Sequence, residues 1–353
     1  MKTINAGLIG YGMAGRIFHA PFLNIVPGFN LSKICTNNPD AIKLANERYP
    51  QTTIVSKSEE IFDDENIDLV FILTPSESHY ELTKKALLAE KHVVVDKPFT
   101  ATTAQADELI ELSEKTGKLL SVYQNRRYAS DYKTVKKLLE AGTLGKIVEF
   151  TSCFDRYVPG LRPKKWKEEA REAGGVLYDL GAHLIDQSLQ LFGMPLEVTA
   201  NIRYQRENTL IDDYFMLTLQ YPETTVYLHS GMIVKIPGPV FAIHGTNGSF
   251  VKHGLDVQEG HLDEGQIPVG KDWGMEPQSM WGTLSTYING LPVTATVESE
   301  KGNYTEYFEN LRDAIWGKVP SAVNPRDSRN VIKIIELAFQ SAKEKRTIPF
   351  KSQ

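Results

Sequence analysis

The chain has 353 residues, which at roughly 150 residues per domain predicts about two domains, each large enough to bury its own core. Lysine and arginine total 39 against 44 aspartate and glutamate, so the formal net charge is −5 and no nucleic-acid or anionic membrane partner is expected. The composition, 41% hydrophobic and 24% charged, is ordinary for a globular protein, and the length excludes a small scaffold held together by disulfides or metal.

Two features predict a reducing, cytoplasmic location. The cysteines, Cys35 and Cys153, are far apart in the sequence, and the first residues, MKTINAGLIGYG, lack the charged start and long apolar run of a signal peptide. The most apolar stretch, Leu69 to Leu73, is much shorter than the ~20 residues that cross a bilayer. No membrane-spanning segment is therefore expected.

Strand and helix patterns alternate along the first third of the chain. The expected strands are Ile4 to Ile9, Phe29 to Cys35, Thr53 to Val55, Asp68 to Thr74, His92 to Pro98 and Leu119 to Asn125. Helical patterns lie between them, at Ile17 to Leu23, Pro39 to Arg48, Ser78 to Glu90 and Thr103 to Thr116. Because strands covered on both faces are typical of parallel sheets, residues 1–122 are predicted to form a doubly wound parallel sheet of the Rossmann type.

The pattern changes after Asn125. Strand-like runs now dominate: Ile147 to Phe154, then VTANIRYQR, DYFMLTLQY, TVYLHSGM, VFAIHG, STYING and VTATVE. The expected helices are Asp131 to Ala141, Leu177 to Phe192, Tyr304 to Trp316 and Pro325 to Lys345. Residues 123–353 are thus predicted to form an α+β domain with an open, mainly antiparallel sheet. An apolar face left in water is unfavourable, so a homodimer or homotetramer is expected.

A glycine motif links the first strand to the first helix. Gly10, Gly12 and Gly15 form GYGMAG, in the strand-to-helix context that a dinucleotide fingerprint requires. The first glycine permits the tight turn, the second lets the backbone approach a pyrophosphate, and the third allows close helix packing. The predicted cofactor contacts here are Gly10, Gly12, Met13, Ala14 and Gly15. The alternative interpretation of the motif is a plain tight turn.

The end of the second strand bears on the choice of cofactor. A carboxylate there would bind the ribose of NAD, and a basic side chain would accommodate the 2′-phosphate of NADP. The chain has Thr36, Asn37 and Asn38, with Asp40 expected in the first turn of the next helix. Because no carboxylate repels a 2′-phosphate and amide and hydroxyl groups can donate to one, NADP is favoured over NAD. The alternative is a solvated turn without selectivity.

Polar segments follow the fourth and fifth strands. These are TPSESH, from Thr74 to His79, and DKP, from Asp96 to Pro98. Ligands of doubly wound sheets bind beyond the carboxyl ends of the strands, so Lys97 is placed to point into that crevice. Thr74, Pro75, His79, Asp96 and Lys97 are accordingly predicted to contact the cofactor. A surface lysine on a turn is the alternative for Lys97.

A third segment, GGVLYDLGAHLID, opens the helix that begins near Leu177. Asp179 and His183 are four residues apart and are predicted to share one helix face, with Asp186 three residues further on. A histidine oriented by a carboxylate can act as a general base near neutral pH. These three side chains could also ligate a metal, but no second histidine or cysteine stands at ligand spacing, so no metal is expected.

The order of GYGMAG, TPSESH, DKP and GGVLYDLGAHLID resembles the Gfo/Idh/MocA family of NAD(P)-dependent oxidoreductases, over nearly the whole chain. SVYQNRRY, YDLGAHLIDQSLQLFGMP and SAKEKRTI are similar to its NADP-dependent scyllo-inositol dehydrogenase branch. The family commonly has EKP where this chain has Asp96, Lys97 and Pro98, and the branch tends to have an arginine where this chain has Asn38.

The resemblance implies roles for three residues. Lys97 would contact the reacting hydroxyl, His183 would be the general acid and base, and Asp179 would orient the substrate or the histidine. The implied reaction is hydride transfer between NAD(P) and a CH–OH or ketone group of a cyclic polyol or sugar, with scyllo-inositol the expected substrate. A nicotinamide-binding sensor without turnover and an NAD-dependent glycosidase of the same fold are the alternatives.

Polar and aromatic residues are expected to line the substrate pocket. They are Tyr123, Asn125, Arg127, Tyr157 and Trp166, together with His183. Tyr157 and Trp166 could instead be core or interface residues. Arg126 and Arg127 could meet a carboxylate or phosphate of a ligand, or pair with Asp131 on the following helix.

Overall fold

The computed structural model describes residues 2–162 and 168–351, and within these residues the chain forms two compact units. Unit 1 comprises residues 1–125, 258–273 and 303–329, and unit 2 comprises residues 126–257, 274–302 and 330–353. The sequence suggests a single boundary after residue 122. In the structure, two later segments also belong to unit 1. Within the described ranges, no helix is both long enough and apolar enough to span a bilayer.

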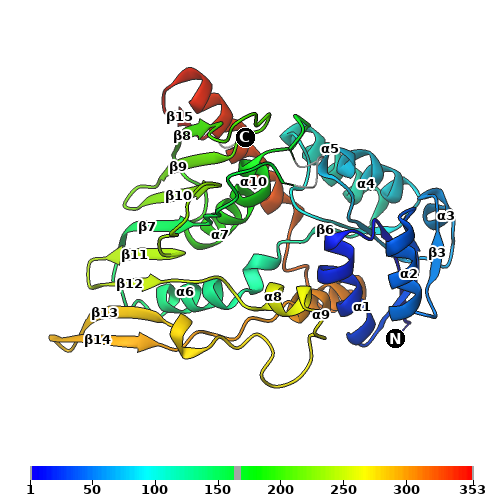
Figure 1. Ribbon diagram of the computed structural model, residues 1–353, viewed down its shortest axis with the longest axis horizontal. Coiled ribbons are helices and arrows are strands. Elements are labelled where there is room, and N and C mark those ends of the chain that lie inside the picture. The colour runs from blue at the N-terminus through cyan, green and yellow to red at the C-terminus, as the bar shows by residue number, and fades with distance from the viewer. Residues whose placement is uncertain (1, 163–167, 352–353) are drawn as a thin grey trace. The chain divides into compact units, whose positions relative to one another are not determined.

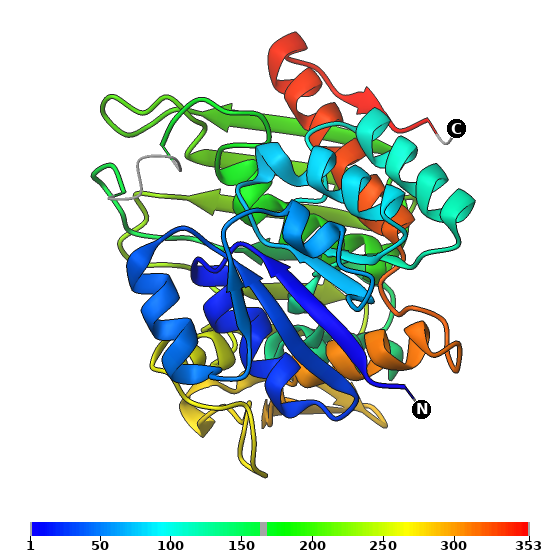
Figure 2. The same cartoon turned by 90° about the vertical axis from the view of Figure 1, so that its right-hand side faces the viewer.

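The sheet of unit 1 has, within the described residues, six parallel strands in the order β3-β2-β1-β4-β5-β6 (Figure 2). They are β1 (Ile4–Ile9), β2 (Phe29–Cys35), β3 (Thr53–Val55), β4 (Leu69–Ile72), β5 (His92–Val95) and β6 (Leu120–Val122). This is the strand order of a Rossmann fold, in which the order reverses between β1 and β4. The predicted doubly wound parallel sheet is confirmed.

Helices lie on both faces of this sheet. They are α1 (Ala20–Ile25), α2 (Pro39–Arg48), α3 (Glu59–Phe62), α4 (His79–Leu88), α5 (Thr103–Thr116), α8 (Gln258–Asp263) and α9 (Thr305–Ile315). Right-handed crossovers put α1 and α2 on one face and α4 and α5 on the other, because the two halves of the sheet progress in opposite directions. All four residues of β4 are buried, as a doubly covered strand requires.

An aromatic cluster fills the core of unit 1 beneath α1. The rings of Phe22 and Phe308 stack with centroids 4.9 Å apart, and His19 lies 4.2 Å from Tyr123. Phe308 belongs to α9, so residues from the end of the chain complete the core begun by α1.

The sheet of unit 2 has, within the described ranges, nine strands in the order β14-β13-β12-β11-β7-β10-β9-β8-β15 (Figure 1). They are β7 (Ile147–Cys153), β8 (Glu197–Arg203), β9 (Tyr214–Gln220), β10 (Thr225–Gly231), β11 (Phe241–Gly245), β12 (Gly248–Lys252), β13 (Gly282–Ile288), β14 (Leu291–Val297) and β15 (Ile348–Pro349). β7 and β10 are parallel neighbours, whereas the other pairs are antiparallel. The predicted mainly antiparallel sheet is confirmed.

The helices of unit 2 include α6 (Ser130–Glu140), α7 (Ala182–Phe192) and most of α10 (Pro325–Glu344). Short helical turns lie at η2 (Ser76–Ser78) in unit 1, at η6 (Gln278–Met280) in unit 2, and at η3 (Asn125–Tyr128) where the two units join. Side chains alternate along the central strands of the unit 2 sheet. Phe150, Leu217 and Leu228 are buried on the face that α7 contacts, whereas Thr151, Thr218 and Tyr227 on the other face are partly exposed.

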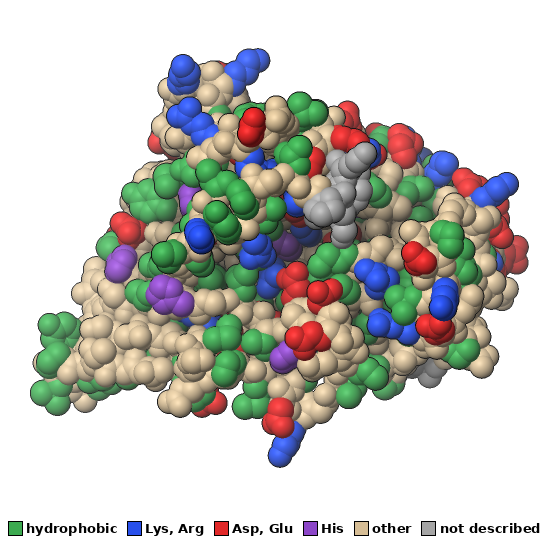
Figure 3. Space-filling model, in the orientation of Figure 1, with side chains coloured by type: hydrophobic (Ala, Val, Ile, Leu, Met, Phe, Trp, Pro, Cys, Tyr) green, Lys and Arg blue, Asp and Glu red, His purple; other side chains and the backbone are tan. Residues whose placement is uncertain are grey.

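The hairpin formed by β13 and β14 carries exposed apolar residues at its tip (Figure 3). Tyr287, Ile288 and Leu291 are each more than half exposed. Asn289 and Gly290 form the turn with positive φ values of 50° and 80°, as a tight two-residue hairpin requires. The sequence run STYING is therefore a strand followed by this turn.

Candidate active site

The glycine motif of unit 1 has the geometry of a dinucleotide-binding turn. Gly10 has φ +102°, and a Cβ there would lie 2.7 Å from the carbonyl oxygen of Leu73. A Cβ on Gly15 would lie 2.7 Å from the carbonyl oxygen of Gly10, whereas one on Gly12 would meet nothing within 4 Å. The first and third glycines are therefore required by packing, and the second leaves open space where a pyrophosphate can approach the backbone. This turn fits the pyrophosphate of a bound dinucleotide.

The helix after this turn begins as a π-helix, η1 (Ala14–His19), before α1 continues it. The sequence predicts only a helical pattern here. Single π-turns are frequent at functional sites, because they shift the register of the side chains that follow. Met13 and Ala14, both predicted cofactor contacts, lie at the start of this turn.

Two arginines that the sequence analysis did not single out lie near the glycine turn. Arg16 donates from Nε to the carbonyl oxygen of Gly12 at 3.3 Å. Burial raises the pKa of Tyr11, and the nearby charges of Arg48 and Arg16 act in the opposite direction. This part of unit 1 therefore carries positive charge suited to phosphate groups. The position of Arg16, directly after the last glycine of the motif, was the available signal.

The residues after β2 are partly committed to local structure. The Asn38 side chain caps α2 by accepting from the Ala41 N–H at 3.0 Å, and Asn37 donates to the carbonyl oxygen of Ser56 at 3.1 Å. The hydroxyl of Thr36 accepts from the Asn38 N–H at 3.4 Å. Asp40 lies in the first turn of α2, as expected. The segment thus has no carboxylate directly after β2. Part of its polar atoms already form hydrogen bonds within unit 1.

His79 ties together the segments that follow β4 and β5. Its Nδ1 lies 2.8 Å from the carbonyl oxygen of Pro98, and its Nε2 lies 2.9 Å from that of Thr74. Burial lowers the pKa of His79, so the neutral ring has one N–H to donate. His79 is 1% exposed. The ring lies between the two segments and, when neutral, donates to one of these two carbonyl oxygens. The contact with cofactor expected from the sequence stays a prediction.

Lys97 lies on the second of these segments and is half-buried. Its N–H donates to Asp96 Oδ1 at 2.8 Å, and the Asp96 N–H donates to the carbonyl oxygen of Ile72 at 3.0 Å. The peptide bond between Lys97 and Pro98 is cis. The backbone on both sides of the lysine is therefore held by contacts with β4, the Asp96 carboxylate and His79.

In unit 2, Asp212 fixes the start of the helix that carries His183. Its Oδ2 accepts from the Leu177 N–H at 2.8 Å, and its carbonyl oxygen accepts from the Val176 N–H at 2.9 Å. Gly175 has φ +90°, and a Cβ there would lie 1.8 Å from Asp212 Oδ1. Burial raises the pKa of Asp212 to about 6. The sequence gives a signal for the glycine but none for its distant carboxylate.

This helix also begins with a π-turn, η5 (Leu177–Gly181), and continues as α7. Asp179 lies in the π-turn and His183 in the first turn of α7, so the regular spacing on which the sequence argument rested does not hold throughout. His183 is 7% exposed, and its ring stacks on Phe154 with centroids 6.4 Å apart. Asp179 lies 3.5 Å from Nη1 of Arg162, which places a cation beside this carboxylate.

Asp186 has a structural partner. Its carboxylate accepts from Nε and Nη2 of Arg127 at 2.8 and 2.6 Å, in a pair that is almost fully buried. Arg127 therefore does not pair with Asp131, whose carboxylate accepts from the N–H groups of Tyr132 and Asp256. The pair commits two guanidinium donors to the fold, which weakens the expectation that Arg127 binds substrate. Two acceptor oxygens engaged by arginine also argue against Asp186 as a metal ligand.

The other residues expected in the substrate pocket are differently placed. Tyr123 is 2% exposed and lies in the aromatic cluster of unit 1 against His19 and Tyr307, so its ring is a core group. Asn125 is buried, and Tyr157 is half exposed beneath the Lys235 ammonium group. Trp166 lies outside the described residues. Among these expected pocket residues, Asn125 and Tyr157 stay predictions.

Comparison with known proteins agrees with this geometry. Residues 4–124 match the model for the oxidoreductase family NAD-binding Rossmann fold, and residues 136–350 match that for the oxidoreductase family C-terminal alpha/beta domain. Over 348 residues, covering 99% of this chain and 96% of the relative, the chain is 41% identical to scyllo-inositol 2-dehydrogenase (NADP(+)) IolW of Bacillus subtilis (strain 168).

Solved structures extend the similarity to the whole fold. The oxidoreductase yvaA from Bacillus subtilis has a TM-score of 0.96 at 40% identity, with 99% of each chain covered. An oxidoreductase from Bacteroides fragilis has a TM-score of 0.90 at 41% identity, covering 99% of this chain and all of that one. The matches to the Rossmann and C-terminal models together span nearly the whole chain. The protein belongs to the Gfo/Idh/MocA family of NAD(P)-dependent oxidoreductases.

Proposed function

We propose that this protein transfers a hydride between NADP(H) and the CH–OH or ketone carbon of a cyclic polyol, with scyllo-inositol as the expected substrate. The observation that carries the proposal is the full-length similarity to IolW, whose name gives that substrate and that cofactor. The presence of Lys97 and His183 in the corresponding motifs supports turnover rather than a sensor role.

A bound NADP(H) would supply the hydride-transfer chemistry of the proposed reaction. His183 takes the hydroxyl proton on a ring nitrogen during oxidation and returns it during reduction. The Lys97 ammonium group donates a hydrogen bond to the same oxygen and stabilises the negative charge that develops on it. Asp212 holds the start of the His183 helix, and His79 holds the segment of Lys97, so both groups are oriented before substrate binds.

Asp179 is assigned to substrate orientation. The Arg162 guanidinium group donates from Nε to Glu168, and its Nη1 lies 3.5 Å from Asp179 Oδ2. A charged carboxylate accepts hydrogen bonds from sugar or inositol hydroxyls without competing for the proton that His183 handles. An Asp179→Asn variant is therefore expected to raise KM more than it lowers kcat.

The test is nicotinamide absorbance on mixing the purified chain with scyllo-inositol, myo-inositol, glucose and other sugars, each with NADP and then with NAD. Turnover of scyllo-inositol that is faster with NADP supports the whole proposal. Turnover of a different sugar keeps the reaction and replaces the substrate. Tight NADPH binding without turnover of any of them would favour the sensor. Hydrolysis of a glycoside without net change in absorbance would favour the glycosidase.

We also propose that the chain pairs through the open face of the unit 2 sheet. Tyr227 and Thr218 lie partly exposed on that face, and Met216 beside them is 43% exposed. Burying such a face between two copies removes apolar surface from water. Sedimentation should give a dimer or tetramer at micromolar concentration, and a monomer would contradict the proposal.

A further inference from the structure

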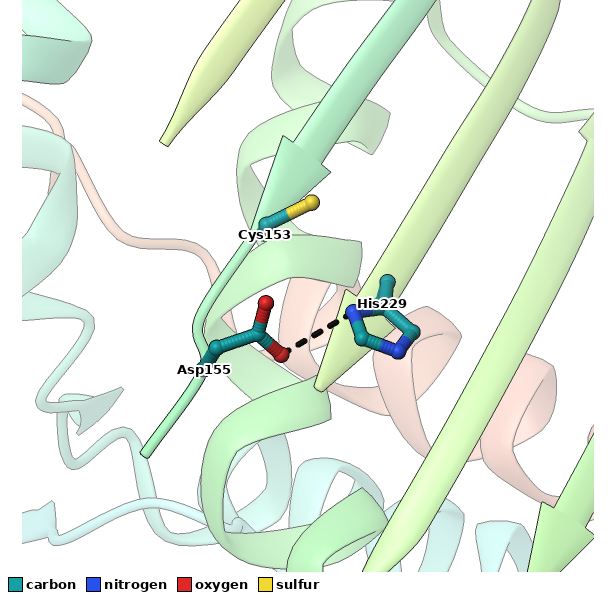
Figure 4. Close-up of side chains that lie close together, drawn as sticks. All are labelled: Cys153, Asp155 and His229. Atoms are coloured by element: carbon teal, nitrogen blue, oxygen red, sulfur yellow. Dashed lines mark ion pairs between the residues drawn. The ribbon is translucent and has the colours of Figure 1, made fainter. Parts of the chain in front are cut away.

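Three side chains of unit 2 that the proposed reaction does not use converge at the ends of two parallel strands. Cys153 is the last residue of β7, Asp155 follows two residues later, and His229 lies in β10 (Figure 4). The register pairs His229 directly with Cys153. Residues two apart in an extended chain point to the same side, so Cys153 and Asp155 both flank the imidazole.

The three groups lie within the span of one coordination sphere. One ligand atom from each residue can be chosen so that all three lie within 4.8 Å of one another. His229 Nδ1 lies 3.0 Å from Asp155 Oδ1, and the side chains are 18% and 6% exposed. Oδ1 also accepts from the Gly231 N–H at 2.9 Å, so the backbone of β10 fixes the carboxylate. A ligand held by an outer hydrogen bond in this way is typical of protein metal sites.

This cluster is on the face of the sheet opposite to α7. The intervening residue, Phe154, points the other way and stacks on His183 of that helix. In Figure 4 the three labelled side chains project from the strands on the side away from the helices. The cluster is therefore separate from the proposed acid and base, and a metal held there would be structural with respect to turnover.

The chemistry of the three ligands selects the metal. A thiolate, an imidazole and a carboxylate together suit Zn²⁺, which binds sulfur, nitrogen and oxygen in tetrahedral geometry. Mg²⁺ and Ca²⁺ prefer oxygen ligands only, so a site containing cysteine and histidine disfavours them. We propose that Cys153, Asp155 and His229 bind one Zn²⁺ ion per chain, with the fourth position open to water.

Zn²⁺ binding to this cluster involves no oxidation or reduction. The Cys153 thiol loses its proton to solvent as the Zn–S bond forms, and His229 and Asp155 bind through a ring nitrogen and a carboxylate oxygen. The ion replaces the hydrogen bond between His229 and Asp155 as the link between β7 and β10. Occupancy should therefore raise the stability of unit 2, by mass action, in proportion to the logarithm of free metal.

The test uses Co²⁺ as a spectroscopic probe for the zinc site in the full-length, chelator-treated protein. A tetrahedral site with a thiolate ligand should give intense visible bands and a sulfur-to-cobalt charge-transfer band that saturate at one ion per chain. Zn²⁺ should displace the cobalt and abolish the bands. Absence of saturable bands, together with no calorimetric binding of Zn²⁺ at micromolar concentration, would overturn the proposal.

Matched variants locate the site. Cys153→Ser should remove the charge-transfer band, and His229→Asn should weaken Zn²⁺ binding by more than the ~10-fold to 100-fold cost of losing an outer hydrogen bond. Cys35→Ser changes the other cysteine, which lies in unit 1, and should leave both readouts unchanged. A band that survives in Cys153→Ser would refute the assignment. Circular dichroism with chelator present checks that Cys153→Ser is folded, and His229→Asn gives an independent result if it is not.

Discussion

The two sheets of this protein differ in how many of their faces are covered by helices. The sheet of unit 1 is covered by helices on both faces, and its strand β4 is buried along its whole length. The sheet of unit 2 alternates buried and partly exposed residues, because helix α7 packs against one face. A doubly covered sheet presents only its carboxyl edge for ligand binding, whereas a singly covered sheet keeps a whole face for other uses. The glycine turn for the cofactor accordingly lies at the carboxyl edge of the unit 1 sheet, and the proposed zinc site lies on the face of the unit 2 sheet opposite α7.

Two histidines of unit 1 and two aspartates of unit 2 have pKa values that burial shifts in opposite directions. Burial lowers the pKa of His19 to about 3 and of His92 to about 4 in unit 1. Burial raises the pKa of Asp131 and of Asp212 to about 6 in unit 2. Both shifts favour the neutral form, but they have opposite consequences as the pH falls.

The largest expected effect is a loss of turnover when the proposed reacting group of either unit is removed. Lys97→Met in unit 1 and His183→Ala in unit 2 should each lower kcat by ~10²-fold to 10⁴-fold, the range for a general acid or base and its electrostatic partner. The affinity for NADPH should change little. Lys115→Met and His244→Ala, in the same respective units, are the controls, and steady-state kinetics with fluorescence titration of NADPH measures both quantities. Near-normal turnover in either variant would remove that residue from the mechanism.

The next effect tests whether each unit depends on its own strained glycine. Gly10→Ala and Gly175→Ala both force a side chain into positive φ and into close contact, so each should lower the free energy of unfolding by about 2–3 kcal/mol. Gly10→Ala should also abolish NADPH binding, whereas Gly175→Ala should retain it and lose turnover. Gly238→Ala, where a Cβ would meet nothing within 4 Å, is the control for calorimetric unfolding. Equal NADPH affinities in the two variants would show that the cofactor does not depend on the turn at Gly10 more than on the turn at Gly175.

The pH dependence of stability should differ in sign between the units. His19 and His92 have folded pKa values below the ordinary 6.5, so their stabilising effect is full above pH 6.5 and is lost below it, at up to ~1.4 kcal/mol per pH unit each. Asp131 and Asp212 have folded values above the ordinary 3.8, so their contribution is full below pH 3.8 and is lost as the pH rises through about 6.

Hydrogen exchange at about pH 7 and about pH 5, corrected for intrinsic rates, measures this in each unit separately. Protection should fall in α1 and β5 of unit 1 relative to α6 and α7 of unit 2 as the pH is lowered. His19→Met removes one of the two histidines and should reduce the loss in unit 1. If both units lose protection equally, the assignment of these buried groups is wrong.

The smallest expected effect concerns cofactor choice. Asn38→Asp keeps an acceptor that can cap α2 and adds a negative charge after β2, so NADP should bind about 10-fold more weakly while NAD is little affected. Asn38→Ser keeps a capping hydroxyl without the charge and serves as the control. Equal KM changes for the two cofactors would place the 2′-phosphate away from this segment.

All six strands of unit 1 could be predicted, and β1, β2 and β3 have the expected bounds, whereas β5 and β6 each end three residues earlier than expected. The helices α2 and α5 also have the expected bounds, because capping residues such as Asn38 and Thr102 and the C-terminal Gly117 mark the helix ends locally. In unit 2 most strands could be predicted from the sequence, but β12 and β15 were missed, and no local pattern indicates the parallel pairing of β7 with β10. Pairing depends on contacts between distant segments, to which local patterns are insensitive.

The candidate site shows the same limit. The glycine motif, Lys97 and His183 could be chosen because short motifs mark them. Asp212, Arg162 and the Cys153 cluster could not, because each depends on a partner far along the chain. Tyr123 shows a related limit: an aromatic residue at a strand end suits a pocket and a core equally well, and its contacts with the rings of His19 and Tyr307 could not be read from local sequence.

The interleaving of the two units has a consequence for synthesis. The aromatic core of unit 1 needs Tyr304, Tyr307 and Phe308, which leave the ribosome only after most of unit 2 has been made. Until then the rings of Phe22 and His19 lack part of their cover. During synthesis, the core of the nascent Rossmann segment is therefore incompletely packed until the rest of the chain has been translated. A fragment that ends at residue 125 would remain in that unfinished state permanently.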